Sequence, residues 1–326
     1  MDAIIRHATQ GHGCPTHENR FRRYNPAMTP TAIEPHCEPA QLSVIVSEIE
    51  TDLARRVNAL DIPEALRAAI RYAVLGGGKR LRPILTMLAC EAVGGRRDDA
   101  RAAAAALELV HTFSLVHDDL PAMDDDEFRR GRPTLHVHCG EALAILAGDA
   151  MLSIAFEWIS EASIPDGQKS QLNRELAAAC TCMIAGQVYD TIGGLPSGRA
   201  GRQRLHLIHR NKTAALLRVA CRIGATCGNA TPEIQHALSD FGRAVGMMFQ
   251  IVDDLLDITQ SAEHTGKATG KDERAGKLTF PAVHGTEESK HEIRRLRLEA
   301  HHALEPLGEA AQPLLELCDY MAVRTR

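Results

Sequence analysis

The amino-acid sequence predicts an all-α protein that folds as one large helical bundle. Apolar residues recur at steps of three and four along most of the chain, beginning with 41–53, as they do on one face of an amphipathic helix. No alternating strand pattern is present, so neither a parallel sheet nor a dinucleotide-binding fold is expected. Aromatic residues make up only 4% of the 326 residues, and this shortage disfavours a β-sandwich or a barrel.

The expected helices are separated by clusters of glycine and proline. Breakers stand at 76–78, 94–95, 193–196, 231–232 and 266–277. Alanine runs such as 102–106 favour helix formation and let neighbouring helices approach closely. No repeat of 20–50 residues holds its register, which disfavours a solenoid. The expected helices cover 41–53, 64–75, 79–93, 98–119, 140–161, 168–189, 202–227, 232–258, 287–305 and 308–322.

Residues 1–40 differ from the rest of the chain. They hold several His, Pro, Arg and Gly residues and no apolar period, so a flexible extension is expected before a helical domain at 41–326. A start at Met28 in place of Met1 would remove most of this extension. That start is a hypothesis, and mass spectrometry of the natively expressed protein would test it.

Composition excludes several classes of function. Lys and Arg number 37 and Asp and Glu number 42, so the net charge is 37 − 42 = −5, and a broadly basic nucleic-acid surface is not expected. Aromatic residues for stacking on single strands are also scarce. No apolar run approaches the roughly 20 residues of a membrane span, and no signal-peptide core follows Met1. We therefore expect a cytoplasmic protein without a membrane span.

The nine cysteines indicate a reducing compartment. They include no C-x-x-C motif, and most stand in apolar helical stretches, where a free thiol behaves as a small hydrophobic group. The cluster of His136, His138 and Cys139 has no partner pair at zinc-ligand spacing. Ordinary helix-surface and core histidines are the favoured interpretation there.

The strongest chemical signal is an acidic segment that follows an apolar helix. Six carboxylates fall within 118–127, and a helix end with such repulsion needs cations to relieve it. Pro121 should loosen the helix after Asp118 and Asp119 and let Asp124 return to the same side. Oxygen ligands in this number suit Mg²⁺, which bridges carboxylates to substrate phosphates. Taken alone, the segment could also be a solvated acidic helix end.

A second acidic segment favours the metal site. Asp253 and Asp257 are four residues apart and share one helix face, with Gln250 one turn earlier on the same side. Phe249 and Leu256 give this helix an apolar flank. Two Asp-rich helices with apolar flanks predict carboxylates that face each other across a cavity.

Basic residues complete the pattern. Lys79 and Arg82 stand one turn apart at a helix start, where backbone N–H groups attract anions. A Walker A loop is excluded, because Ala73 replaces its first glycine and Arg80 follows the lysine. With the acidic segments, this pattern implies two separate diphosphates, bound through metals and directly. The other cationic positions are Arg129, Arg130, Arg132, Lys212, Lys267 and Lys277.

These motifs, in this order, resemble those of trans-isoprenyl diphosphate synthases, the polyprenyl synthetase family, and are most similar to bacterial short-chain farnesyl and geranylgeranyl diphosphate synthases. The four residues between Asp119 and Asp124 resemble the longer bacterial version of the first motif. The resemblance implies an isoprenoid-synthase bundle around a central apolar cavity and a homodimer. The matching segments are 76–83, 118–132, 186–190, 212–213, 249–257 and 266–277.

The resemblance also implies roles for individual residues. Mg²⁺ is the implied cofactor, with three ions per active site and Mn²⁺ able to substitute. The implied metal ligands are Asp118, Asp119, Asp124, Asp253, Asp254 and Asp257. The implied substrate-binding residues are Lys79, Arg82, His111, Arg129, Arg130, Lys212, Thr213, Gln250, Lys267 and Lys277. The implied catalytic set is Asp118, Asp119, Asp124, Lys212, Gln250, Asp253 and Asp254.

The implied reaction is the Mg²⁺-dependent head-to-tail condensation of isopentenyl diphosphate with dimethylallyl, geranyl or farnesyl diphosphate, which yields a C15–C20 trans-prenyl diphosphate. Phe113 precedes Asp118 by five residues, so it lies roughly 7–8 Å deeper at about 1.5 Å per residue. In the family a bulky residue there is a floor, and Phe113 with Ser114 would set the chain length. This favours C15 farnesyl diphosphate; C20 geranylgeranyl diphosphate and an ordinary core role for Phe113 stay open.

Rival functions fit less well. A class I terpene cyclase handles one diphosphate, which leaves Lys79, Arg82 and Arg130 without a purpose. A non-catalytic synthase subunit would have eroded Asp motifs, whereas both are intact here. Head-to-head condensing enzymes match 76–83 poorly, and a calcium-binding helical protein would need an EF-hand spacing that the sequence lacks.

Overall fold

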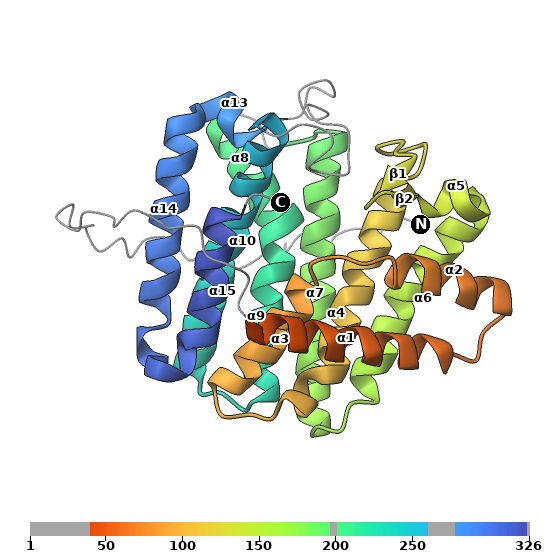
Figure 1. Cartoon of the computed structure of the whole chain (residues 1–326), viewed down its shortest axis with the longest axis horizontal. Coiled ribbons are helices and arrows are strands. Elements are labelled where there is room, and N and C mark those ends of the chain that lie inside the picture. Colours follow the sequence, from red (N-terminus) through yellow and green to blue (C-terminus); the bar gives the residue numbers. More distant parts are fainter. Residues whose placement is uncertain (1–39, 196–200, 260–277, 325–326) are drawn as a thin grey trace, which may run out of the picture. The chain divides into compact units, whose positions relative to one another are not determined.

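The computed structural model describes residues 40–195, 201–259 and 278–324. These residues are helical throughout, apart from turns and one two-stranded hairpin (Figure 1). The all-helical prediction is confirmed. The expected extension, with Met1 and Met28, lies outside the described residues except for Ala40, and the described helices all belong to the compact unit Glu34–Arg326.

The elements follow in chain order. They are α1 (Ala40–Asn58), α2 (Glu64–Val74), α3 (Leu81–Ala92), α4 (Arg97–Asp118), β1 (Phe128–Arg129), β2 (Arg132–Pro133), α5 (Leu135–Cys139), α6 (Glu141–Ser160), α7 (Asp166–Thr191), α8 (Gly201–His209), the π-helical turn η1 (Arg210–Ala214), α9 (Ala215–Cys227), α10 (Pro232–Thr259), α13 (Phe280–His284), α14 (Thr286–Ala303), the 3₁₀ segment η2 (Glu305–Ala311) and α15 (Gln312–Val323).

Helix α4 lies at the centre of the packing and carries the site at its C-terminal end. It packs against α3, α6 and α9, and α9 in turn packs against α10 (Figure 1). Its alanine run is buried from Ala102 to Ala106, and Leu107, Leu109 and Val110 bury the next turns. Small side chains let the surrounding helices approach closely enough to enclose α4.

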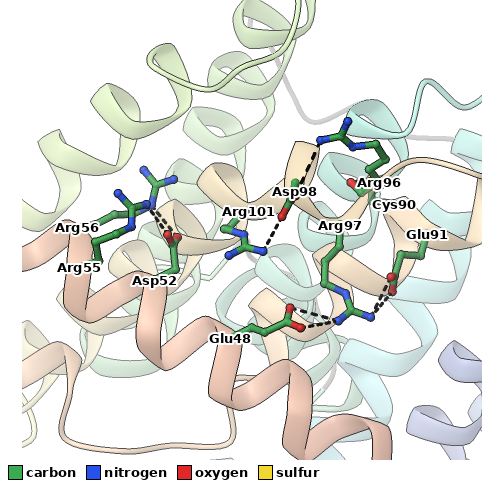
Figure 2. A network of polar contacts seen from close by, with 10 residues as sticks. All are labelled: Glu48, Asp52, Arg55, Arg56, Cys90, Glu91, Arg96, Arg97, Asp98 and Arg101. Atoms are coloured by element: carbon green, nitrogen blue, oxygen red, sulfur yellow. Dashed lines mark hydrogen bonds and ion pairs between the residues drawn. The ribbon is translucent and has the colours of Figure 1, made fainter.

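Helix α1 runs across the bundle and is held there by apolar and ionic contacts (Figure 1). Its own apolar side chains Ile45, Ile49 and Leu53 are buried. On its outer side, Glu48 accepts from Arg97 at the start of α4 at 3.1 Å, and Arg97 also pairs with Glu91 of α3 at 2.9 Å (Figure 2). One guanidinium therefore joins three helices at the end of the bundle away from the acidic segment.

The short helices α5 and α13 were not expected, and the start of the helix expected at 308–322 is the 3₁₀ segment η2. Two further local features differ from the sequence expectation. The helix expected at 202–227 is interrupted by η1 at Arg210–Ala214. A short antiparallel hairpin, β1 with β2, follows the acidic segment; its turn residues Arg130 and Gly131 have φ of 54° and 71°. Two successive positive φ values match the right-handed twist of paired strands. Strand pairs this short have no periodicity that a sequence could display.

Helix α6 is long and apolar enough, by length and composition alone, to span a membrane. It is the single such helix in the described parts of the chain, with a mean hydropathy of 1.6, and 44% of that stretch is buried. Ala144, Ala147 and Met151 are buried where the helix packs against α4 and α2. A helix packed in the core can have the same length and composition, so α6 is only weak evidence for a membrane span.

Candidate functional site

A cavity of about 1370 Å³ is lined by residues of α3, α4, α6, α7, η1 and α10. The sequence-predicted residues that line it are Lys79, Arg82, His111, Phe113, Ser114, Asp118, Arg129, Arg130, Lys212, Thr213, Gln250, Asp253, Asp254 and Asp257. Segments more than a hundred residues apart thus contribute to one cavity. Lys267 and Lys277 lie outside the described residues.

The first acidic segment turns back on itself at the end of α4. The backbone N–H of Asp124 donates to the carbonyl of Asp118 at 2.8 Å, and that of Asp126 donates to the carbonyl of Asp119 at 3.2 Å. The expected return of Asp124 beside Asp118 is confirmed at the level of the backbone. The helix ends where Pro121 follows within one turn, since proline cannot donate to the helix.

Asp118 is the carboxylate of this segment that lines the cavity. Burial raises its pKa to about 6, and the neighbouring Asp124 and Asp119 add to the rise against the opposing effect of Lys212 and Arg129. Its negative charge is thus under-compensated by the protein. A divalent cation beside it would relieve that imbalance, so the donor set fits the implied metal.

Asp119 faces a different partner. It is 3% exposed, and Arg129 Nε donates to its Oδ1 and Oδ2 at 2.9 and 2.8 Å, with Arg129 Nη2 to Oδ1 at 2.6 Å. The residues that line the cavity within the described chain include neither Asp119 nor Asp124. Asp119 therefore fixes Arg129 at the cavity wall, and its role as a metal ligand stays a prediction.

A chain of hydrogen bonds holds Gln250 on the α10 side. Thr213 Oγ1 donates to Gln250 Oε1 at 2.5 Å, and Gln250 Nε2 donates to Asp254 Oδ1 at 2.9 Å. Asp254 is 3% exposed and accepts the backbone N–H of Phe280 at 2.8 Å. His209 lies 3.5 Å from the same carboxylate, and burial lowers the pKa of His209 to about 3, so it is neutral at pH 7. Asp254 thereby orients Gln250 toward the cavity.

Asp253 is paired from the far end of the chain. Arg324, which follows α15, donates through Nη2 to Asp253 Oδ1, and its guanidinium carbon lies 3.9 Å from the centre of the Phe249 ring. The Arg324 side chain is 1% exposed and that of Asp253 is 41% exposed. Asp253 thus keeps one side toward the cavity while Arg324 fixes the other.

The basic residues gather around the turn before α3. Arg130 donates to the backbone carbonyl of Gly77. Burial lowers the pKa of Arg82 to about 10. Burial first, and then Arg82, lower the pKa of His111 well below its usual value, so His111 is neutral at pH 7. Buried, partly desolvated cations bind phosphate oxygens more strongly than exposed ones.

Lys212 is placed by the π-helical turn and by a glycine. Its ammonium lies 2.6 Å from Asp190 Oδ2 of α7. Gly186, also on α7, lies so close to η1 that a Cβ there would be 2.3 Å from the backbone nitrogen of Lys212. Only glycine permits this approach, which brings the segments 186–190 and 212–213 into contact. π-Turns inside helices frequently occur at functional sites.

Phe113 and Ser114 both line the cavity, and their role as its floor stays a prediction. Phe113 is 6% exposed, lines the cavity and meets the ring of His117 edge-on with centroids 5.8 Å apart. Ser114 also lines the cavity, and its hydroxyl donates to the carbonyl of His111 at 2.9 Å. Ile184 and Val188 of α7 form part of the same wall.

The carboxylates of the two segments do not converge on one metal-sized point. In the described chain, the single group of three acidic, His or Cys side chains with ligand atoms within 4.8 Å of one another is His301, Cys318 and Asp319. Arg297 already binds both oxygens of that aspartate, at 2.6 and 2.9 Å. In the cavity, ions would have to be shared between the carboxylates and a bound diphosphate.

Three residues of the site were not identified from the sequence. They are Arg324, which binds Asp253, and the ion pair Arg80 and Glu108, both of which line the cavity. For Glu108 a signal existed, because it is the single charged residue in the apolar stretch 102–110. A charged side chain inside a buried helix requires a partner. Arg324 offered no comparable signal.

Comparisons with known proteins give a consistent result. The family model of the polyprenyl synthetases matches residues 63–310. Geranylgeranyl pyrophosphate synthase 11 of Arabidopsis thaliana, a chloroplastic protein, is 45% identical over 274 residues, which cover 81% of this chain and 76% of that protein. The large subunit 2 of a heterodimeric geranylgeranyl pyrophosphate synthase from the same organism is 43% identical over 268 residues, covering 81% and 71%.

Solved structures agree. A geranyltransferase from Legionella pneumophila has a TM-score of 0.76 at 32% identity, and the match covers 86% of this chain and 95% of that chain. An FPP/GFPP synthase from Zymomonas mobilis, without ligand, has a TM-score of 0.76 at 32% identity, with coverage of 87% and 99%. The matches therefore extend over nearly the whole of these solved chains.

Proposed function

Since the chain belongs to the polyprenyl synthetase family and is therefore a prenyltransferase, we propose that it joins isopentenyl diphosphate head-to-tail to an allylic diphosphate and releases a C15–C20 trans-prenyl diphosphate. One observation carries the proposal. A single cavity is lined by Asp118 from the first acidic segment, by Asp253 and Asp257 from the second, and by a separate group of cations around Lys79. Two anionic groups therefore have distinct places around one apolar space.

Mg²⁺ is the proposed cofactor, bound by Asp118, Asp253 and Asp257, with Asp119, Asp124 and Asp254 in support. The fit rests on the under-compensated charge of Asp118, whose pKa is raised to about 6 by burial. When bound, the ions would stabilise negative charge on the departing diphosphate. Three ions per site, and Mn²⁺ as a substitute, stay predictions.

The residues of the chain complete the allylic end. Lys212 and Arg129 line the cavity and would bind the allylic diphosphate directly, adding donors where charge develops as the C–O bond breaks. The hydrogen bonds of Thr213 and Asp254 hold Gln250 at the reaction centre. Lys267 and Lys277 are proposed for the same diphosphate from the resemblance alone.

The second diphosphate belongs to isopentenyl diphosphate. Lys79, Arg82, His111 and Arg130 line the cavity and would bind it, so that its double bond faces the allylic carbon. Leu115, Leu152 and Met183 among the lining residues make the space between apolar, which excludes water that would quench an allylic cation. Loss of a proton then restores an alkene, and the released diphosphate is the proposed base.

The direct test incubates the purified chain with Mg²⁺, isopentenyl diphosphate and each allylic diphosphate, and measures product length by chromatography. Condensation with at least one primer is expected. Conversion of a single prenyl diphosphate to a hydrocarbon would instead indicate a cyclase, and no turnover with any primer would indicate a non-catalytic subunit.

Product length has two supported candidates. Phe113, which lines the cavity, favours C15 farnesyl diphosphate if its ring is the floor, because a ring there would shorten the space for the growing chain. The relatives at 43–45% identity are named geranylgeranyl pyrophosphate synthases, which favours C20. Sizing the product in the assay above decides between the two.

Phe113→Ala is expected to lengthen the product by at least one five-carbon unit. The substitution removes a cavity-lining ring that packs against His117 and replaces none of the proposed diphosphate-binding residues. Product chromatography at matched turnover measures the change. Phe241→Ala is the matched control, since Phe241 is fully buried and does not line the cavity. An unchanged product profile for Phe113→Ala would remove Phe113 from chain-length control.

A homodimer is the proposed assembly. Less than half of the apolar stretch of α6 is buried, and Leu146 of this helix is 58% exposed. Ala177 and Ala178 are exposed on the adjacent α7. A second copy would cover this surface, and light scattering measures the mass.

A cytoplasmic location stays a prediction; the seven described cysteines are free thiols, which is typical of a reducing compartment.

A further inference from the structure

Arg80 lines the cavity together with its neighbours Lys79 and Arg82, yet its own side chain is completely buried, at 0% exposure. Its backbone is left-handed, with φ of 48°, a conformation that non-glycine residues adopt only when their surroundings enforce it. We propose that Arg80 is a positioning residue for the isopentenyl diphosphate end of the cavity, and this rests on the function proposed above.

Three different elements fix the Arg80 guanidinium. Nε donates to Glu50 of α1 at 2.6 Å, Nη1 donates to Glu108 of α4 at 2.5 Å, and Nη2 donates to the carbonyl of Val74 at the end of α2 at 2.7 Å. The planar guanidinium fork can bind all three at once, whereas a lysine ammonium lacks this fixed geometry. The turn from α2 into α3 is therefore tied to α1 and α4 through one side chain.

This fixed turn determines where the neighbouring cations lie. Lys79 precedes Arg80 and Arg82 occupies the first turn of α3, and both line the cavity. Because Arg80 is left-handed, the side chains before and after it leave the backbone in directions that a relaxed helical residue would not give. Loss of its three contacts removes the reason for that conformation and displaces both cations together.

Glu108 gives Arg80 a second, electrostatic effect. The Glu108 side chain is 2% exposed and lines the cavity; its Oε1 accepts from Arg80, while Oε2 has no hydrogen-bond partner among the described residues. Its charge also acts on Arg82 and Arg130. Without Arg80, an uncompensated carboxylate would face the place where a diphosphate binds, and it would repel the anion.

Loss of either effect should weaken the binding of the same substrate, isopentenyl diphosphate. Arg80→Met is therefore expected to raise the KM for isopentenyl diphosphate at least tenfold, with the KM for the allylic diphosphate and kcat changed less than threefold. The guanidinium nitrogens of Arg80 all donate to the protein itself, so the substitution should leave the chemistry at Asp118 and Lys212 intact. A merely structural role would instead lower the melting temperature and the active fraction, and leave both KM values of the folded enzyme unchanged.

A double variant separates the two effects and guards against misfolding. Arg80→Met with Glu108→Gln removes both charges of the buried ion pair, so it is expected to fold even where Arg80→Met alone does not. Its KM for isopentenyl diphosphate should fall between those of Arg80→Met and the wild type. It should also exceed that of Glu108→Gln alone, because the two differ only in the guanidinium that fixes the turn.

Glu48→Gln is the matched control. Glu48 lies two residues from Glu50 on the same helix and also accepts from an arginine of another element, Arg97, but at a network remote from the cavity lining (Figure 2). Its KM values should equal those of the wild type. If the wild type condenses the substrates, equal KM values for isopentenyl diphosphate in the double variant and in Glu108→Gln would overturn the positioning role of Arg80 and leave the proposed function standing. A wild type without condensation activity would instead overturn the proposed function.

Discussion

Replacing Asp118 with alanine should lower kcat by roughly 10³-fold or more, about 4 kcal/mol of transition-state stabilisation. Asp118 lines the cavity at the end of α4 and carries the proposed ions against the departing diphosphate. Without this carboxylate the ions lose a ligand from the first acidic segment, and the leaving group loses the charge that stabilises it. Steady-state turnover with saturating isopentenyl and allylic diphosphates, at fixed Mg²⁺, measures the loss.

The fold should survive this substitution. Burial raises the pKa of Asp118 to about 6, so its ionised form costs free energy in the metal-free protein, and its removal should leave the melting temperature unchanged or slightly higher. Asp98→Ala is the matched control, because Asp98 lies in the first turn of the same helix, is 61% exposed and pairs with Arg101 (Figure 2). Near-normal turnover of Asp118→Ala would refute the metal assignment.

Removal of divalent cations should abolish turnover, and added Mg²⁺ should restore it. The carboxylates of α4 and α10 form no cluster of three ligands within 4.8 Å in the cavity of the described chain, so the proposed ions would complete their coordination with water and a bound diphosphate. Activity after dialysis against a chelator, followed by titration with Mg²⁺ and Mn²⁺, measures the requirement. K⁺ at the same ionic strength controls for screening of the charged cavity.

Melting curves distinguish this requirement from a structural one. The core is formed by apolar contacts around α4, so the chain without bound diphosphate should melt at nearly the same temperature with and without Mg²⁺. Stabilisation should appear when Mg²⁺ and a diphosphate are added together, because ligands that bind only the folded state stabilise it. Full turnover after thorough chelation would show that catalysis needs no metal.

Periodicity and spacing were enough to identify the main features of this protein. The steps of three and four identified the helices, since amphipathic helices repeat their apolar face within a single segment. Asp253 and Asp257 are four residues apart, about one helical turn, so the sequence placed both on one helix face, and both line the cavity. The segments 76–83 and 118–132 are dense in charged residues that no packed helix would otherwise carry, so they were visible without a structure.

Contacts between distant segments had no comparable signature. The π-turn at Arg210–Ala214 packs closely against Gly186 of α7, a contact that no local pattern records. Asp119 and Asp124 looked equivalent to Asp118 by composition, yet the backbone reversal turns Asp119 toward Arg129. Hydrogen bonds of this kind depend on the direction of side chains after folding, and adjacent residues of one type can end in different surroundings.

The sequence by itself therefore determined the helical class, the two acidic segments and the chemistry they serve, because each is written in local spacing and composition. The tertiary structure alone decided which carboxylate faces the cavity, that Arg324 from the end of the chain fixes Asp253, and that Arg80 is a buried link among three elements. Burial and pairing arise from packing between segments far apart in the chain, and that packing sets the charge and position of each functional group.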